Sequence, residues 1–206
     1  TAAADTTAST VTSEPGKTLT LTTGTDNVIG GAGNDTISSS SSTFNSDDMI
    51  NGGEGSDSFS VAATGAATTI ANLSNTELVK VTQGGAGGTD YALNMISATG
   101  VENVMSRLST GEVSFDNLQN LVGVHAFGTQ SGANVTAAFL NSLASGTADT
   151  VSLIIDGGAN ATFQVSGTTD TNEFETINLA TNGTTANTVS IKDAGGNNPA
   201  SLKTYN

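Results

Sequence analysis

The strongest constraint on this chain is an aspartate that recurs in the same phase of a nine-residue block near the N-terminal end. Residues 21–29, 30–38, 43–51 and 52–60 align as LTTGTDNVI, GGAGNDTIS, TFNSDDMIN and GGEGSDSFS. The sixth residue of each block is Asp and the eighth is apolar, and the serines at 39–42 separate the second and third blocks without changing this phase. A repeat of such short period predicts stacked short strands joined by turns.

Two of the blocks, GGAGNDTIS and GGEGSDSFS, match the calcium-binding nonapeptide G-G-x-G-x-D-x-U-x. Six residues of such a block form a tight turn, in which glycine permits backbone conformations that other residues avoid. The last three residues form a short strand whose apolar side chain points inward. Successive blocks should lie on opposite sides of a flat roll, so that the first stacks on the third and the second stacks on the fourth.

Calcium takes six to eight oxygen ligands from carboxylates, backbone carbonyls and water. We therefore expect calcium between stacked turns, with Asp26 facing Asp48 across one site and Asp35 facing Asp57 across the other. The glycines of the two complete turns belong to the expected sites: Gly30, Gly31, Gly33, Gly52, Gly53 and Gly55. The alternative is that these turns are ordinary Asp- and Gly-containing turns without an ion. The third block lacks the glycines, so the Asp26/Asp48 site is the less complete of the two.

Beyond residue 61 a longer repeat begins, in which an acidic residue precedes alternating apolar residues. It is found at 77–81, 102–106, 149–153 and 175–179, with a version lacking the acid at 122–126. Further short strands are predicted at 91–93, 113–115, 135, 161–165 and 189–191. Two strands and two turns in about 25 residues are what one coil of a parallel β-solenoid requires.

Two segments have apolar residues at helical spacing instead. They contain Phe115, Leu118 and Leu121, and Phe139, Leu140 and Leu143. The sequence as a whole therefore predicts an all-β protein with one or two short helices against its flank. A linker at 1–17 would lead into a calcium-binding parallel β-roll at 18–61, which would continue as a parallel β-solenoid at 62–206.

The charge and the missing motifs narrow the function. Nineteen acidic residues against five basic ones give a formal net charge of −14, which repels nucleic acid and attracts cations. An uninterrupted apolar run of about 18 residues is absent, so we expect no membrane span. The sequence contains no H-E-x-x-H, G-x-S-x-G or phosphate-binding loop, and its single histidine, His125, lies in an apolar strand. We expect a protein that is not an enzyme.

Residues 18–60 resemble RTX proteins. The segment TLTLTTGTDNVIG, followed by GNDT, is similar to the RTX surface-layer proteins of the Caulobacter and Campylobacter type, as are IDGGANAT at 155–162 and the repeated acid-led strands. The resemblance implies type I secretion and an extracellular, cell-surface (S-layer) subunit, whose calcium-bound solenoid assembles with copies of itself. It places any contact with outer-membrane lipopolysaccharide in a region outside this chain. The alternative is an RTX adhesin, or a non-catalytic carrier domain of a type-I-secreted exoenzyme.

Overall fold

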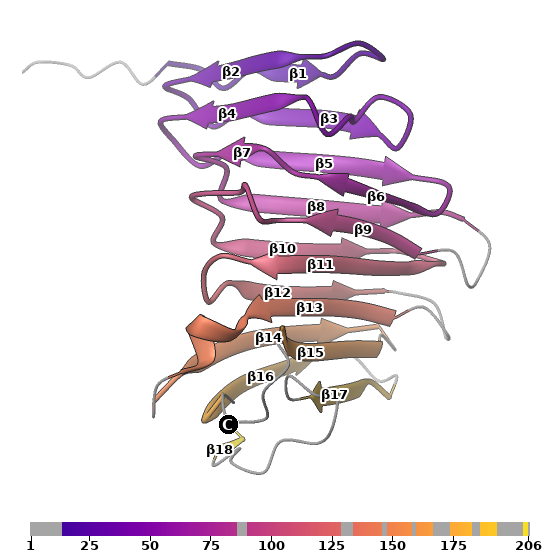
Figure 1. The fold of residues 1–206 in the computed structure, drawn as a ribbon, viewed down its shortest axis with the longest axis vertical. Coiled ribbons are helices and arrows are strands. Elements are labelled where there is room, and N and C mark those ends of the chain that lie inside the picture. Colours follow the sequence, from indigo (N-terminus) through magenta and orange to yellow (C-terminus); the bar gives the residue numbers. More distant parts are fainter. Residues whose placement is uncertain are drawn as a thin grey trace, which may run out of the picture.

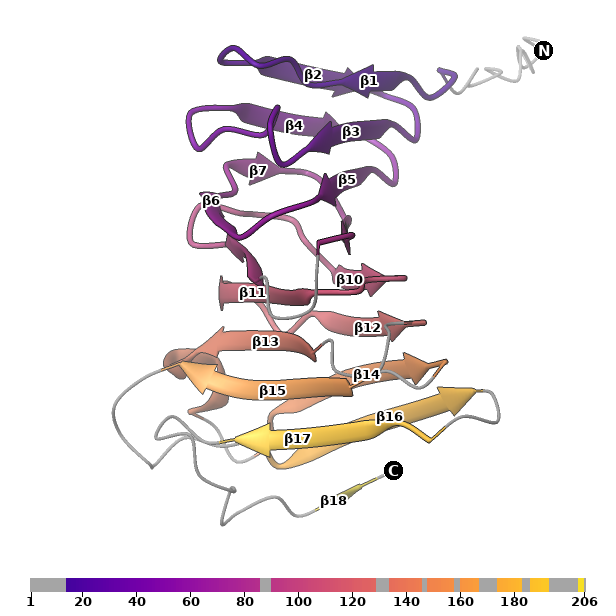
Figure 2. The same ribbon diagram turned by 90° about the vertical axis from the view of Figure 1, so that its right-hand side faces the viewer.

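The structure, a computed structural model, describes residues 14–85, 90–128, 134–145, 148–157, 160–166, 174–182, 186–192 and 204–205. The described chain is almost entirely β-strand, and its parallel strands stack in layers along one axis as a β-solenoid of about 6 turns (Figures 1 and 2). This confirms the predicted all-β solenoid. None of the described helical segments is long and apolar enough to cross a membrane.

Three parallel sheets form the walls of the solenoid. The nine-stranded sheet runs from one end to the other and contains β1 (Thr18–Thr20), β3 (Thr36–Ser40), β5 (Ser58–Ala63), β8 (Leu78–Gln83), β10 (Asn103–Arg107), β12 (Gly123–Phe127), β14 (Thr150–Asp156), β16 (Thr176–Asn182) and β18 (Thr204–Tyr205). The three-stranded sheet contains β2 (Asn27–Gly31), β4 (Met49–Gly53) and β7 (Leu73–Ser74). The six-stranded sheet contains β6 (Ala67–Ile70), β9 (Asp90–Asn94), β11 (Glu112–Leu118), β13 (Asn134–Leu140), β15 (Asn160–Ser166) and β17 (Thr188–Lys192).

The core is a set of apolar columns, because strand alternation turns every second side chain inward and the parallel register stacks these side chains on one another. One column of the nine-stranded sheet passes through Leu19, Ile37, Phe59, Val79, Val104, Val124, Leu153 and Leu179. Its members from Ile37 to Leu153 are buried. Burying one such side chain stabilises the fold by about 1.5–3 kcal/mol. Each layer therefore depends on its neighbours above and below.

The nine-residue blocks pair as the sequence predicted. Strand β2 pairs with β4 and β3 pairs with β5, so the first and third blocks share one side and the second and fourth share the other. Phe44, in the loop that follows the serines, turns into the core and meets Phe59 edge-on with ring centroids 4.8 Å apart. The sheet continues past residue 61 without a break, since β5 pairs with β8 over its whole length.

The predicted flanking helices are wrong in one segment and reduced to a single turn in the other. Phe115 and Leu118 lie in strand β11, where a β-bulge between them places both side chains inside. Asn117, within the bulge, has a φ of 56°. The extra residue of the bulge gives two inward residues the spacing of a helix. In the other segment Phe139 and Leu140 end strand β13, and only a 3₁₀ turn follows, η1 (Asn141–Ala144).

Candidate metal centre

A column of acidic residues lies where strands of the nine-stranded sheet begin. Asp35, Asp57 and Glu77 each immediately precede a strand, β3, β5 and β8 respectively. The N–H of Asp35 donates to Oδ1 of Asp57 over 2.6 Å, and the N–H of Asp57 donates to Oε2 of Glu77 over 2.6 Å. In the preceding layer, the N–H of Lys17 donates to Oδ1 of Asp35 over 2.5 Å. Each carboxylate thus binds the backbone of the neighbouring layer.

The acidic column contains residues from both the nine-residue blocks and the longer repeat. Glu77 opens the first of the longer repeats, yet it occupies the same position as the nonapeptide aspartates, and Glu102 follows it in register. Glu175 repeats the contact further on, where its Oε2 accepts the N–H of Asp149 over 2.8 Å. That second column is displaced by two residues, because Gly123 pairs with Ser152 and not with Thr150.

Asp35 and Asp57 each carry one oxygen without a partner. Their side chains are only 2% and 1% exposed, and Oδ2 of each is buried without a hydrogen bond in the described part of the chain. Each of these oxygens faces the first glycine of its own nine-residue block. A Cβ on Gly30 would lie 2.2 Å from Oδ2 of Asp35, and one on Gly52 would lie 2.4 Å from Oδ2 of Asp57. A buried, unpaired carboxylate oxygen is costly, so these two atoms are the candidate ion ligands of the site.

The surroundings of Asp57 make its negative charge unfavourable. Burial raises the pKa of the Asp57 carboxyl, and the nearby charges of Glu77 and Asp35 raise it further, while the N–H of Asp35 partly offsets them. Removal from water and like charges both disfavour an ionised acid. A bound cation would relieve both effects.

The other glycines of the two complete turns fall into two groups. Gly31, Gly53 and Gly55 have φ values of 140°, 109° and 128°, which side chains rarely adopt. Gly33 has no room for a side chain, because a Cβ there would lie 2.5 Å from the carbonyl oxygen of Glu14. The ammonium of Lys17 donates to the carbonyl oxygen of Gly30, so a cationic group already contacts the first turn.

Asp26 and Asp48 meet in the same way on the three-stranded sheet, but their carboxylates are already occupied. Oδ1 of Asp48 accepts the N–H of Asp26 over 2.8 Å, and its Oδ2 accepts the N–H of Asn45 over 2.7 Å. The Asp26 carboxylate accepts the N–H and the hydroxyl of Thr22. All four oxygens have donors, so this pair is the weaker candidate.

The residues present fit an ion that accepts backbone oxygens. Across the described residues no group of three or more His, Cys, Asp or Glu side chains converges on one point. Asp35 and Asp57 would therefore hold an ion together with turn carbonyls and water. Calcium accepts such a shell, whereas zinc prefers nitrogen and sulfur.

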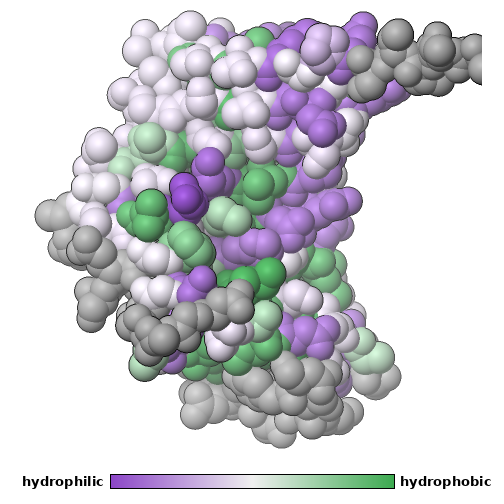
Figure 3. All heavy atoms as spheres, turned by 180° about the vertical axis from the view of Figure 1, so that it is seen from behind, coloured by the Kyte–Doolittle hydropathy of each residue, from purple (hydrophilic) through white to green (hydrophobic). Residues whose placement is uncertain are grey.

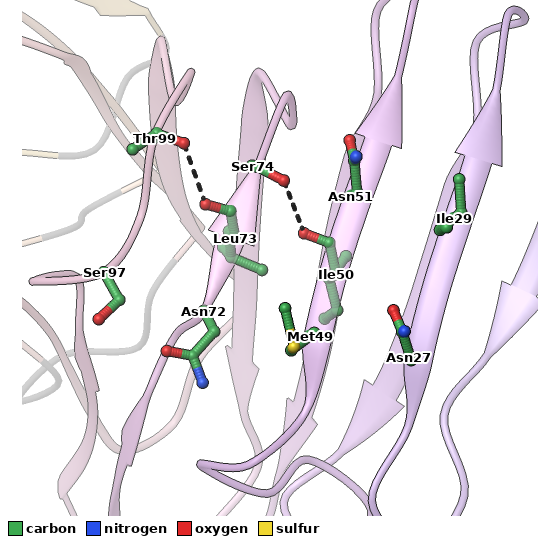
Figure 4. A pocket seen from close by; sticks show the side chains of 10 residues that line it. All are labelled: Asn27, Ile29, Met49, Ile50, Asn51, Asn72, Leu73, Ser74, Ser97 and Thr99. Carbon is green, nitrogen blue, oxygen red and sulfur yellow. Dashed lines mark hydrogen bonds between the residues drawn. The ribbon is translucent and has the colours of Figure 1, made fainter.

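A pocket of about 380 Å³ lies on the outer face of the three-stranded sheet (Figure 4). Figure 4 shows Asn27 and Ile29 from β2 beside Met49 and Asn51 from β4. Its lining side chains are Asn27, Ile29, Met49, Ile50, Asn51, Asn72, Leu73, Ser74, Ser97 and Thr99. These described side chains are apolar, amide or hydroxyl groups, which do not serve as general acids or bases in the way that His, Asp or Glu do.

His125 points outward from β12 and is half-buried. Burial lowers the pKa of its imidazole.

No family model, curated protein or solved structure matches this chain.

Proposed function

We propose that this chain is a secreted, structural protein of the cell surface, in which calcium stabilises the N-terminal layers of a self-associating solenoid. The observation that carries the proposal is the pair of buried oxygens, Oδ2 of Asp35 and Oδ2 of Asp57, that have no partner in the described part of the chain. They belong to the two turns whose sequences match the calcium-binding nonapeptide in full.

The energetics favour an ion at these turns. A carboxylate removed from water is strongly disfavoured unless it is paired, and breaking a buried pair costs about 3–5 kcal/mol. Here the charges that act on Asp57 are those of Glu77 and Asp35, which are themselves negative, so they add repulsion. A divalent cation between the layers would supply the missing partner, and the turns offer it carbonyl oxygens as the first turn does to Lys17.

Calcium binding would then act as folding free energy. Oxygens from separate turns converge only when the layers are stacked, so the unfolded chain has no such site. Extracellular calcium modules bind with dissociation constants of about 10⁻⁴–10⁻³ M, which suits a protein that folds after leaving the cell. The formal net charge of −14 adds a general repulsion that calcium would lower.

The experiment is a folding titration of the whole chain. Circular dichroism and thermal unfolding are recorded in EDTA and then at calcium concentrations around 10⁻⁴–10⁻² M, with magnesium at equal ionic strength as the control. The proposal predicts that calcium, but not magnesium, raises the β-sheet signal or the Tm. Identical unfolding curves in EDTA and in calcium would contradict it. Light scattering on the same samples tests self-association, and a strict monomer throughout would favour a monomeric adhesin.

A further inference from the structure

The outer face of the nine-stranded sheet carries a compact patch over β10, β12 and β14. Two rows of outward side chains cross these strands in register: Met105, His125 and Ile154 form one, and Arg107, Phe127 and Asp156 form the other. They line a shallow pocket of about 180 Å³. Figure 3, which views the molecule from behind, shows apolar side chains gathered low on this face among strongly hydrophilic ones.

The patch has the composition of a protein interface. Phe127 and Ile154 are 41% and 39% exposed, and Arg107 is the only arginine of the chain. Aromatic residues, Met and Arg are the types enriched where proteins meet. The Arg107 guanidinium lies over the Phe127 ring, 5.6 Å from its centroid. Among the described residues neither Arg107 nor Asp156 forms an ion pair, although the chain is rich in acids.

The second row is charge-antisymmetric about its centre. Arg107 stands on one side of Phe127 and Asp156 on the other, each one strand away. Strands lie about 4.8 Å apart, so the two charges are separated by roughly 10 Å. We propose that this patch binds a second copy of the same chain, through a two-fold axis that runs parallel to the strands and passes over β12.

That axis makes the surface complementary to itself. A half-turn about it exchanges β10 with β14 of the other copy, so Arg107 of each copy meets Asp156 of the other and the two Phe127 rings meet at the centre. In the first row Met105 meets Ile154 in both directions. One strand further out, Lys80 meets Ala180, so no like charges oppose one another there. A two-fold interface requires this self-complementarity.

The expected affinity is low. Five strands at about 4.8 Å and five residues at about 3.3 Å each give roughly 400 Å² per copy, about half of a standard interface. We therefore expect association in the micromolar to millimolar range, weakened by salt because the two ion pairs lie at its edge. The dimer gives the self-association in the proposed function a surface and rests on that function to this extent, but it requires no calcium at the patch.

Charge exchange tests the proposal. Sedimentation velocity is run at fixed calcium and at protein concentrations on the order of 0.1–1 mM, where an interface of this size would associate. Arg107→Asp and Asp156→Arg should each be monomeric, since each brings like charges together. An equimolar mixture of the two variants should dimerise, and so should the double exchange R107D/D156R. Lys192→Asp makes the same charge change on β17 of the other large sheet and should leave dimerisation intact.

Circular dichroism confirms that each variant is folded before it is scored. A monomeric wild-type chain, or single variants that still dimerise, would overturn the proposed interface. Failure of the mixture to associate would also overturn it, because mixing the two variants places opposite charges at both ends of the second row again. A wild-type monomer whose Tm still rises with calcium would refute this dimer and leave the calcium proposal standing, so the two failures are distinguishable.

Discussion

The N–H of Asp35 donates to Oδ1 of Asp57 in the next layer over 2.6 Å, while Oδ2 of each aspartate is buried without a partner in the described chain. One oxygen of each carboxylate is therefore used to join layers and the other is left for something else. A turn that only needed a backbone acceptor would leave its second oxygen in water. This division of roles leads to the first two predictions.

Replacing Asp57 or Asp35 with Asn should raise the calcium concentration needed for folding. Asn keeps an oxygen for the neighbouring N–H but removes one negative charge from the ion's surroundings. We expect each single change to weaken calcium binding about tenfold or more, and the double change to add little, because neighbours in one site are not additive. Calorimetric titration measures this. Glu54→Gln, an exposed acid in the same turn, is the matched control, and equal titrations for it and for Asp57→Asn would exclude the site.

Without calcium, mild acid should stabilise the fold. The pKa of Asp57 is raised above 3.8 in the folded state, so the folded chain binds a proton more readily than the unfolded chain. The penalty is fully present above the folded pKa and is relieved as the pH falls through that value towards 3.8. Thermal unfolding in EDTA should show a Tm that rises on acidification below neutral pH.

Comparison of wild type with Asp57→Asn separates the effect of Asp57 on the Tm from that of His125. His125 acts with the opposite sign, because its pKa is lowered and its protonation below about 6.5 favours unfolding. The difference between wild type and Asp57→Asn isolates the aspartate, since both keep His125. Saturating calcium should suppress the rise as well, because the ion replaces the proton. A Tm that falls steadily with acid in EDTA, equally in both proteins, would show that the charge of Asp57 does not destabilise the folded chain.

Glu77→Gln should lower the pKa of Asp57. The charge of Glu77 is one of the causes that raise this pKa, and Gln can still accept the N–H of Asp57. We expect the substituted chain to be more stable than wild type at neutral pH in EDTA. An NMR titration of the Asp57 carboxyl measures the shift directly, with Glu54→Gln again as the control. An unchanged Asp57 pKa in this variant would show that the charge of Glu77 does not act on Asp57.

Gly52→Ala should destabilise the protein at any calcium concentration. The new Cβ would lie 1.9 Å from the carbonyl oxygen of Asn75 and 2.4 Å from Oδ2 of Asp57. Overpacking of this kind costs about 1–3 kcal/mol, and more where backbone must move. Gly65→Ala is the control, because nothing lies within 4 Å of its Cβ and the change should be neutral or slightly stabilising. Urea unfolding in calcium separates the two, and equal midpoints would contradict the packing.

The phase of Asp26, Asp35, Asp48 and Asp57 was enough to predict which strands pair, since alternate blocks of a flat roll can only stack on one side. The sequence did not reveal that the acidic column extends from Asp57 to Glu77. Asn75, with a φ of 47°, takes a left-handed conformation in that turn without glycine, so the motif is hidden. The bulge in β11 misled for a related reason, because one added residue gives Phe115 and Leu118 a helical interval. Periodicity records spacing alone, and different backbones produce the same spacing.

The two-residue shift between β12 and β14 separates the acidic residues into two short runs. In a solenoid each layer feels only its nearest neighbours, so a disturbance travels one rung at a time. Without the ion, the carboxylates of Asp57, Glu77 and Glu102 would repel one another along the column. The next residue in the column is Val122, which carries no charge, so the repulsion would end there. The layers beyond could then stay folded while the first ones open. If the proposed ion site is present, the rod therefore has a polarity that its repeated strands conceal: one end would respond to dissolved ions, and the layers beyond Val122 would remain as the base on which that end refolds.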